Sequence, residues 1–397
     1  MKISSRTAYI AVATMGIVSL FGDVVYEGGR SLIPEYLKFL GASAILVGTV
    51  TGAGEFIGYV LRLLSGSLAD RTKAYWVFIF LGYGLIAVVP LLGLAPSYVI
   101  AILFVILERV GKALRSPSRD TVISAVSKGI GSGKAFGLHE LLDQIGAIGG
   151  PLLVAALMFY SSNNYSSTFV FLFIPFAALV AALLYAYKKV GRSVQPEAKE
   201  AVKGDKKLDK HFYLYNIAIG LNTVGLIPVA LILYRGASIV EPSQQWLIPI
   251  LYVVVQAVDA PSALLAGLAF DRVGVKMLVL PLAASFLPML FISYGGLGLT
   301  GVILACIAYG VVLGMQESIY RAAISGLAPA GARGTAYGIF NTFLGLGTII
   351  AGPIFGFFLE SQLIILPLTY VAAAQVIAIF LLLQSTKHTR EEEAAAQ

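Results

Sequence analysis

The stretch YWVFIFLGYGLIAVVPLLGL, residues 75–94, contains no charged residue and decides the fold class of this chain. A helix needs about 20 apolar residues to cross roughly 30 Å of hydrocarbon. Similar blocks recur at residues 8–20, 168–187 and 363–383. In lipid, backbone N–H and C=O groups must form hydrogen bonds within a helix or a closed barrel. The strands of such barrels are only about 10 residues long and alternate between apolar and polar side chains. We therefore expect an all-α integral membrane protein.

The composition supports lipid as the solvent. Of 397 residues, 58% are hydrophobic and 12% are charged, with a mean hydropathy of +0.86, whereas about a quarter of the residues in a soluble domain are charged. The net charge of +7 is not gathered in one soluble segment, so we expect no nucleic-acid partner. Cys306 is the single cysteine and the three histidines lie far apart in sequence, so we expect no disulfide, metal site or cofactor.

Basic residues lie between alternate apolar blocks, which predicts the orientation in the membrane. The basic connections and ends contain Lys2, Arg6, Arg71, Lys73, Arg115, Arg119, Lys128, Lys134, Lys188 to Lys210, Arg272, Lys276, Arg321, Arg333, Lys387 and Arg390. The opposite connections contain only Lys38 and Arg235 as cations, together with Glu35, Glu241 and Glu360. The positive-inside rule places the first set on the cytoplasmic side of a cell membrane, with both termini inside.

The apolar blocks predict twelve spans in two groups of six. The first group is 8–33, 44–65, 75–95, 98–119, 135–159 and 167–188. The second group is 211–234, 245–268, 277–295, 299–325, 334–359 and 363–384. Residues 191–210 contain five lysines and no aromatic residue, so they read as a cytoplasmic linker between bundles at 1–190 and 211–397.

Two sequence motifs each occur twice, and the separation along the chain is almost the same for both. The turn Gly66-Ser-Leu-Ala-Asp70-Arg71 resembles Gly267-Leu-Ala-Phe-Asp271-Arg272, and Asp70 and Asp271 are 201 residues apart. Two Gly-Pro pairs also recur, because Pro151 and Pro353 are 202 residues apart. Six spans per half make the halves parallel repeats about an axis along the membrane normal. We expect the two bundles to superpose, and the two turns to form a latch that opens and closes during transport.

These motifs resemble those of the major facilitator superfamily over the whole chain. The turn from Gly66 to Lys73 is similar to the family signature, with Thr72 in place of a usual glycine, and its repeat keeps Gly274. The fifth span is similar to the family's antiporter signature, although two closing glycines are missing. Its matching residues are Gly137, Gly146, Gly150 and Pro151. The fourth span resembles the family's membrane-embedded arginine motif at Glu108, Arg109, Gly111 and Lys112.

Gly146 and Gly150 lie on one face of a helix, which predicts close packing against a neighbouring helix. His139 and Asp143 project on the same side, whereas Glu140 projects away from it.

The strongest functional signal is a set of ionisable residues within predicted spans. Each costs about 2.5 kcal/mol or more to place in the membrane, so a role in a pathway or in coupling is the default hypothesis. The set is Asp23, Glu27, Arg30, Glu55, Arg62, Glu108, Arg109, Lys112, Arg115, Asp259, Glu317 and Arg321. The alternative is that they form structural ion pairs, above all Glu317 with Arg321.

Carboxylates in this setting are natural proton carriers, since desolvation and a nearby arginine act on them in opposite directions. We expect Asp23 and Glu27 to carry coupling protons, with Asp143 and Glu140 as second candidates. Arg109 would stabilise a carboxylate or bind an anionic solute.

The sequence thus predicts a monomeric secondary transporter, driven by a proton gradient, that exports a small organic molecule by antiport. Symport or uniport of an anionic metabolite stays open, as does a receptor or sensor without transport. An intramembrane enzyme is not expected, because the chain has neither an HExxH nor a GxSxG motif.

Overall fold

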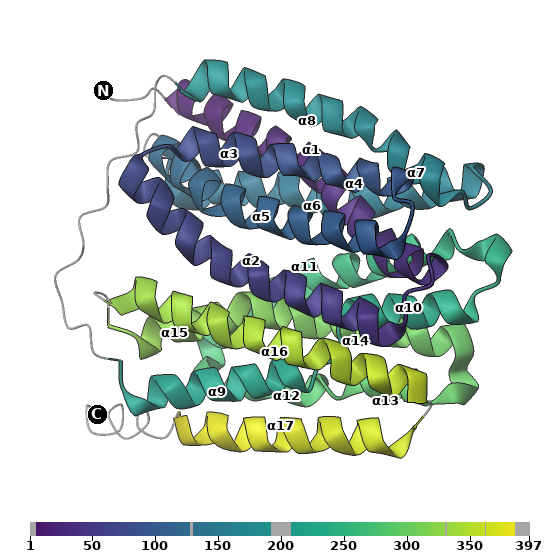
Figure 1. Cartoon of the computed structure of the whole chain (residues 1–397). Helices are drawn as coiled ribbons and strands as arrows, with labels where there is room; N and C mark the ends of the chain where they lie inside the picture. The colour runs from purple at the N-terminus through teal and green to yellow at the C-terminus, as the bar shows by residue number, and fades with distance from the viewer. Residues whose placement is uncertain (1–4, 128–129, 192–207, 330–331, 362, 386–397) are drawn as a thin grey trace. The chain divides into compact units, whose positions relative to one another are not determined.

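The computed structural model describes residues 5–127, 130–191, 208–329, 332–361 and 363–385, and the elements in these ranges are all helical (Figure 1). This agrees with the predicted all-α class. Residues 192–207, most of the predicted linker, lie outside the described residues, as do Lys2, Lys128, Lys387 and Arg390.

The described helices match the predicted spans in order. The first are α1 (Ser5–Phe39), α2 (Ala44–Thr72), α3 (Tyr75–Gly84), α4 (Val88–Leu91), α5 (Tyr98–Val126), α6 (Ser132–Tyr160), α7 (Tyr165–Phe171) and α8 (Phe173–Ala186). The later ones are α9 (Lys210–Val224), α10 (Val229–Ile239), α11 (Leu247–Val273), α12 (Val279–Ala284), α13 (Leu287–Ser293), α14 (Gly298–Met315), α15 (Arg321–Leu327), α16 (Arg333–Ser361) and α17 (Ile365–Ser385). Short 3₁₀ or π turns continue several of them, including η7 (Gly295–Leu297) and η8 (Gln316–Tyr320).

Ten stretches of described residues are long and apolar enough to cross a membrane. One of them, 247–293, contains two predicted spans, and α5 is not among the ten. Helix α5 contains Glu108, Arg109, Lys112 and Arg115, which lower its hydropathy. The chain is therefore a multi-pass membrane protein, and the count of twelve spans stays a prediction.

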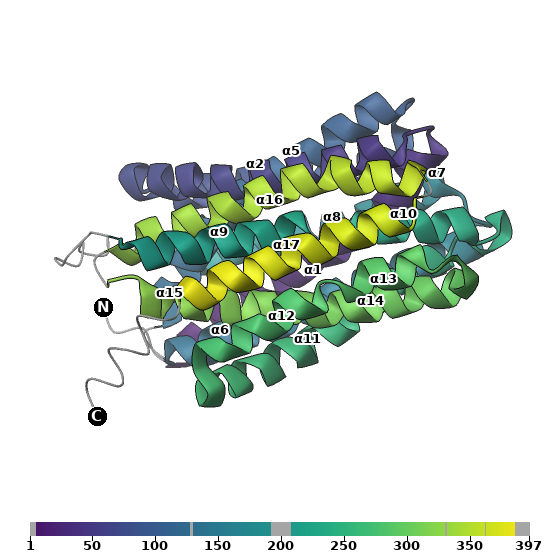
Figure 2. The same cartoon turned by 90° about the horizontal axis from the view of Figure 1, so that it is seen from below.

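The chain forms two compact units whose limits cut through two helices. Unit 1 comprises Met1–Gly41, Ile57–Lys199 and Glu241–Val253, and unit 2 comprises the rest. Helix α2 therefore contributes its first part to unit 2 and its second part to unit 1, whereas α11 contributes its first part to unit 1 and its second part to unit 2. These units describe packing, whereas the predicted bundles describe sequence repetition, so the bundle limits stay a prediction. In unit 2, α9 packs beside α17 (Figures 1 and 2).

Glycines on α6 bring α1 close within unit 1. A Cβ atom at Gly146 would lie 2.5 Å from the carbonyl oxygen of Leu20, and one at Gly150 would lie 2.5 Å from that of Val24. Real Cβ contacts are not this short, so only glycine permits the approach. At Gly137 nothing lies within 4 Å, so the close contact does not extend to that glycine.

The turns after α2 and α11 share a backbone feature. Lys73 has φ of 58° and Gly274 has φ of 68°, both in the left-handed region, and the two positions are 201 residues apart in the sequence. In the first turn the residue that needs glycine-like freedom is therefore Lys73, rather than Thr72 as expected from the signature. The same separation of 201 residues relates both the two sequence motifs and the two positive φ values. The two turns are therefore alike in backbone conformation as well as in sequence.

Candidate functional site

Three polar side chains follow one face of α1 in unit 1. Ser19, Asp23 and Glu27 are spaced four residues apart, and this spacing places them on successive turns of the helix. Ser19 and Glu27 are buried and Asp23 is half-buried. Charged groups from α5 and α6 surround them.

Both oxygens of the Glu27 carboxylate have partners. Its Oε1 lies 3.8 Å from Arg30 Nη1 and 3.9 Å from Lys112 Nζ, and its Oε2 accepts a 2.7 Å hydrogen bond from the Tyr252 hydroxyl. The Arg30 and Lys112 side chains keep 27% and 29% of their surface exposed. One carboxylate therefore serves two cations that are only partly buried.

Cations converge on Tyr26, next to Glu27 in the chain. Its hydroxyl oxygen accepts hydrogen bonds from Arg30 at 3.2 Å, from Lys112 at 3.0 Å and from Arg109. Arg115 also lies 5.6 Å from the centre of the Tyr26 ring. Cations at such distances are attracted by the ring quadrupole. The tyrosine thus holds several like charges together.

Glu108 is the buried counter-charge on α5. Its carboxylate lies 3.7 Å from Arg109 Nε and 3.8 Å from Arg115 Nη2, and all three side chains are buried. Arg115 also lies over the Tyr83 ring at 5.3 Å. The α5 motif thus forms an ion-pair network inside unit 1.

Four cations stand among three carboxylates in this part of unit 1. The charged side chains are Arg30, Arg109, Lys112 and Arg115 against Asp23, Glu27 and Glu108. The adjoining Arg119 contacts two further carboxylates, Asp120 and Asp143. The formal charges of the two groups together therefore cancel.

A second group surrounds Asp143 on α6. Its Oδ2 lies 3.7 Å from Arg119 Nη1 and 3.7 Å from His139 Nδ1. A Cβ atom at Gly146 would lie 3.0 Å from the Asp23 Cβ, so Asp23 packs against the same helix, and its charge interacts with that of Asp143.

Ser19 on α1 connects the group around Asp143 to Tyr83 on α3. Its hydroxyl oxygen accepts from Arg119 Nη1 at 3.3 Å and lies 3.0 Å from His139 Nε2 and 2.9 Å from the Tyr83 hydroxyl. Hydroxyls and an imidazole at these distances form one hydrogen-bonded chain.

The remaining predicted residues lie elsewhere. Glu140 is exposed and accepts a hydrogen bond from Gln144. Arg62 lies over the Tyr59 ring at 5.6 Å in unit 1. The other four belong to unit 2, where Glu55 is half-buried, Asp259 is buried, and Glu317 and Arg321 are exposed.

The predicted gating turns are exposed at their charged residues. Asp70 accepts a 2.9 Å hydrogen bond from the Tyr75 hydroxyl, and Arg71, Asp271 and Arg272 are exposed. Gly66 lies against Pro117, and a Cβ atom at Gly267 would lie 3.0 Å from Ser318 Oγ. The latch role of these residues stays a prediction.

Unit 2 contains a neutral polar network centred on Asn222. Its amide nitrogen donates to Ser285 at 2.9 Å and to Gln375 at 2.7 Å. Its amide oxygen accepts from Gln316 and Tyr320, both at 2.9 Å. All four hydrogen-bonding positions of this buried side chain are therefore used.

The sequence analysis singled out neither this network nor Tyr26 and Tyr252. In the sequence, candidate site residues were recognised as charged residues inside predicted spans. Neutral amide and hydroxyl side chains do not stand out in this way. Among the residues that the structure describes, no group of three or more His, Cys, Asp and Glu side chains could hold a metal ion.

Multiple membrane-crossing helices with charged residues buried among them suit a membrane transporter, and the comparisons with known proteins identify the chain as one. The family model of the Major Facilitator Superfamily matches residues 9–352. This chain belongs to that superfamily.

Two relatives and one solved structure show how far the similarity extends. An uncharacterized protein of Mycobacterium tuberculosis is 36% identical over 362 residues, which cover 88% of this chain and 87% of the relative. An uncharacterized MFS-type transporter of Methanocaldococcus jannaschii is 28% identical over 367 residues, covering 89% and 88%. A crystal structure of a mutant of the nucleoside transporter NupG matches with a TM-score of 0.75 and 15% identity, covering 95% and 100%. The last similarity concerns the fold alone.

Proposed function

We propose that this chain is a secondary active transporter that works by alternating access and exports a small organic solute in exchange for protons. The supporting observation is the row of protonatable side chains on α1. Asp23 and Glu27 lie on successive turns, and cations from α5 stand close to them. The similarity of α6 to the family's antiporter signature supports the direction of transport.

The distances in this row suit coupling. Burial favours the neutral acid and a nearby cation favours the anion, so proton binding depends on where the cation stands. Arg30 and Lys112 are 3.8 and 3.9 Å from Glu27, farther than the roughly 2.7–2.9 Å of a tight charge-assisted hydrogen bond. A small helix movement can therefore withdraw a cation from the Glu27 carboxylate, which then binds a proton.

The experiment uses proteoliposomes loaded with a pH-sensitive dye. Screening solute pools for proton movement first identifies a substrate. Asp23→Asn and Glu27→Gln are then compared with Glu241→Gln, an exposed control. A coupling residue loses uphill transport under an imposed pH gradient but keeps much of the solute exchange without a gradient. If both variants keep full gradient-driven transport, Asp23 and Glu27 are not the coupling residues, and Asp143 and Glu140 become the next to test.

A second candidate function is proton symport of an anionic solute. It is favoured by the three cations that converge on the Tyr26 hydroxyl. If Glu27 takes up a proton, Arg30 and Lys112 lose their shared carboxylate and can bind an anion instead. Proton and anion would then travel together. An inward solute gradient acidifies the vesicle lumen in symport and makes it more alkaline in antiport, so the same dye distinguishes the two.

A further inference from the structure

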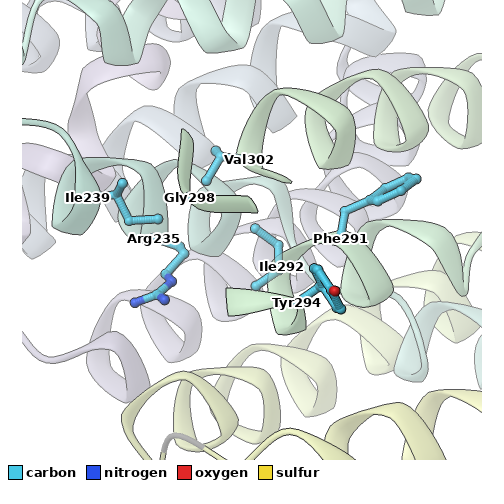
Figure 3. Close-up of a pocket in the computed structure, with 7 residues that line it drawn as sticks. All are labelled: Arg235, Ile239, Phe291, Ile292, Tyr294, Gly298 and Val302. Carbon is cyan, nitrogen blue, oxygen red and sulfur yellow. The ribbon is translucent and has the colours of Figure 1, made fainter. Parts of the chain in front are cut away.

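Unit 2 contains a cavity of about 220 Å³ where three helices end. Arg235 and Ile239 come from α10, Phe291 and Ile292 from α13, and Val302 from α14, and Tyr294 follows α13 (Figure 3). Among the described residues that line it, Arg235 is the only charged one. The cavity therefore combines apolar walls with a single cation.

The cavity has the features of a membrane interface. Tyr294 is 66% exposed at the end of α13, and exposed aromatic residues at helix ends gather at the level of the lipid headgroups. Arg235 is one of only two cations in the connections that the sequence places outside the cell. It is half-buried in the cavity wall, so it does not simply extend into water.

Exposed apolar side chains continue from the cavity along the same helices. Leu287 is 39% exposed one turn before Phe291, and Ile303 and Ile307 are 36% and 38% exposed just after Val302 on α14. All three residues lie more than one turn away from the helix ends that border the cavity, on the side of the bilayer interior. They form an apolar surface that acyl chains can cover.

We infer that this cavity binds the headgroup phosphate of an anionic glycerophospholipid. The Arg235 guanidinium donates hydrogen bonds to the phosphate, a geometry that arginine provides in pairs. A water molecule occupies about 30 Å³ in the liquid, so 220 Å³ holds a headgroup but not a whole lipid. The acyl chains then lie outside, along Leu287, Ile303 and Ile307.

The test is lipid binding to the full-length protein in detergent, followed by native mass spectrometry and thermal unfolding. Phosphatidylglycerol is titrated against wild type, Arg235→Gln and Lys38→Gln, the last being a matched change at the other outer cation. Wild type and Lys38→Gln retain one phosphatidylglycerol molecule and gain the same thermal stability. Arg235→Gln binds it about fivefold more weakly, as expected for one cation facing an anionic headgroup.

A second variant separates the cavity from the charge. Val302→Trp fills the cavity while keeping Arg235, and it also weakens retention of phosphatidylglycerol. Unfolding temperatures without added lipid show that each variant is folded. The inference is overturned if Arg235→Gln binds as wild type does, if Val302→Trp has no effect, or if phosphatidylcholine binds equally well. Inorganic phosphate alone producing the full stabilisation would also overturn it, in favour of a site for a soluble anion.

Discussion

The ion pairs of unit 1 are loosely spaced, whereas the neutral side chains around Asn222 in unit 2 are tightly hydrogen-bonded. In unit 1 the ion pairs of Glu27, Glu108 and Asp143 measure 3.7 to 3.9 Å. Around Asn222 the four hydrogen bonds of the side-chain amide measure 2.7 to 2.9 Å. A saturated neutral network holds one arrangement, whereas loosely spaced charges can change partners. We therefore expect the coupling chemistry to lie in unit 1 and a mainly structural role for the Asn222 network.

The largest expected effect comes from removing the buried counter-charge on α5. Glu108→Gln leaves Arg109 and Arg115 without the carboxylate that both contact. Breaking a buried ion pair by removing one partner costs about 3–5 kcal/mol. We expect this loss in the free energy of unfolding measured by denaturant in detergent micelles. The exposed Glu140→Gln is the control, with a change within about 0.5 kcal/mol. Equal stability of both variants would show that the α5 ion pairs are not structural.

The converse change puts charge into the neutral network. Asn222→Asp replaces a donor that faces Ser285 and Gln375 with a second acceptor oxygen. A buried charge in a membrane helix costs about 2.5–3.5 kcal/mol, so we expect a loss of this order in unfolding free energy. Asn164→Asp is a matched control, because Asn164 caps α7 by accepting from the Ser167 amide and aspartate caps equally well. If Asn222→Asp and Asn164→Asp change the unfolding free energy equally, the network around Asn222 does not disfavour a charge.

A third prediction tests the contact that brings α1 to α6. Gly146→Leu places side-chain atoms where the Leu20 carbonyl and Asp23 already lie, and such overpacking typically costs about 1–3 kcal/mol. Gly149→Leu is the control on the same helix, because nothing lies within 4 Å of its Cβ position. Thermal unfolding and transport are measured for both. Normal transport by Gly146→Leu would show that the glycine is not needed for this interface.

The sequence predicted the helical class and singled out Asp23, Glu27 and Glu108, which the structure places near cations of unit 1. It did so because an apolar run of about 20 residues and a charge inside that run are both strong local signals. It assigned Arg119, however, to a basic connection rather than to the group around Asp143. It could not predict Tyr252 as a partner of Glu27, since the two residues are 225 positions apart and the chain contains 20 tyrosines. Asn222 was missed for a related reason. Its importance comes from four partners that only the folded chain brings together.

The smallest expected effect concerns the backbone at the ends of α2 and α11, where a sequence motif and a positive φ both recur. Gly274→Ala forces a side chain into the left-handed region at φ of 68°, which costs about 1 kcal/mol or slightly more. Gly326→Ala, on α15, also has open space around its Cβ position but no positive φ, so the same substitution is neutral or stabilising there. In the turn after α2, Lys73 already adopts φ of 58° and therefore carries the conformational cost of a side chain in the left-handed region. Lys73→Gly removes this cost, but glycine also raises the conformational entropy of the unfolded chain, which lowers stability. We expect unfolding free energies to fall for Gly274→Ala and to stay level or rise by less than about 1 kcal/mol for Lys73→Gly. A rise for Gly274→Ala or a fall for Lys73→Gly would show that the turns, although their motifs repeat 201 residues apart, do not share one backbone conformation.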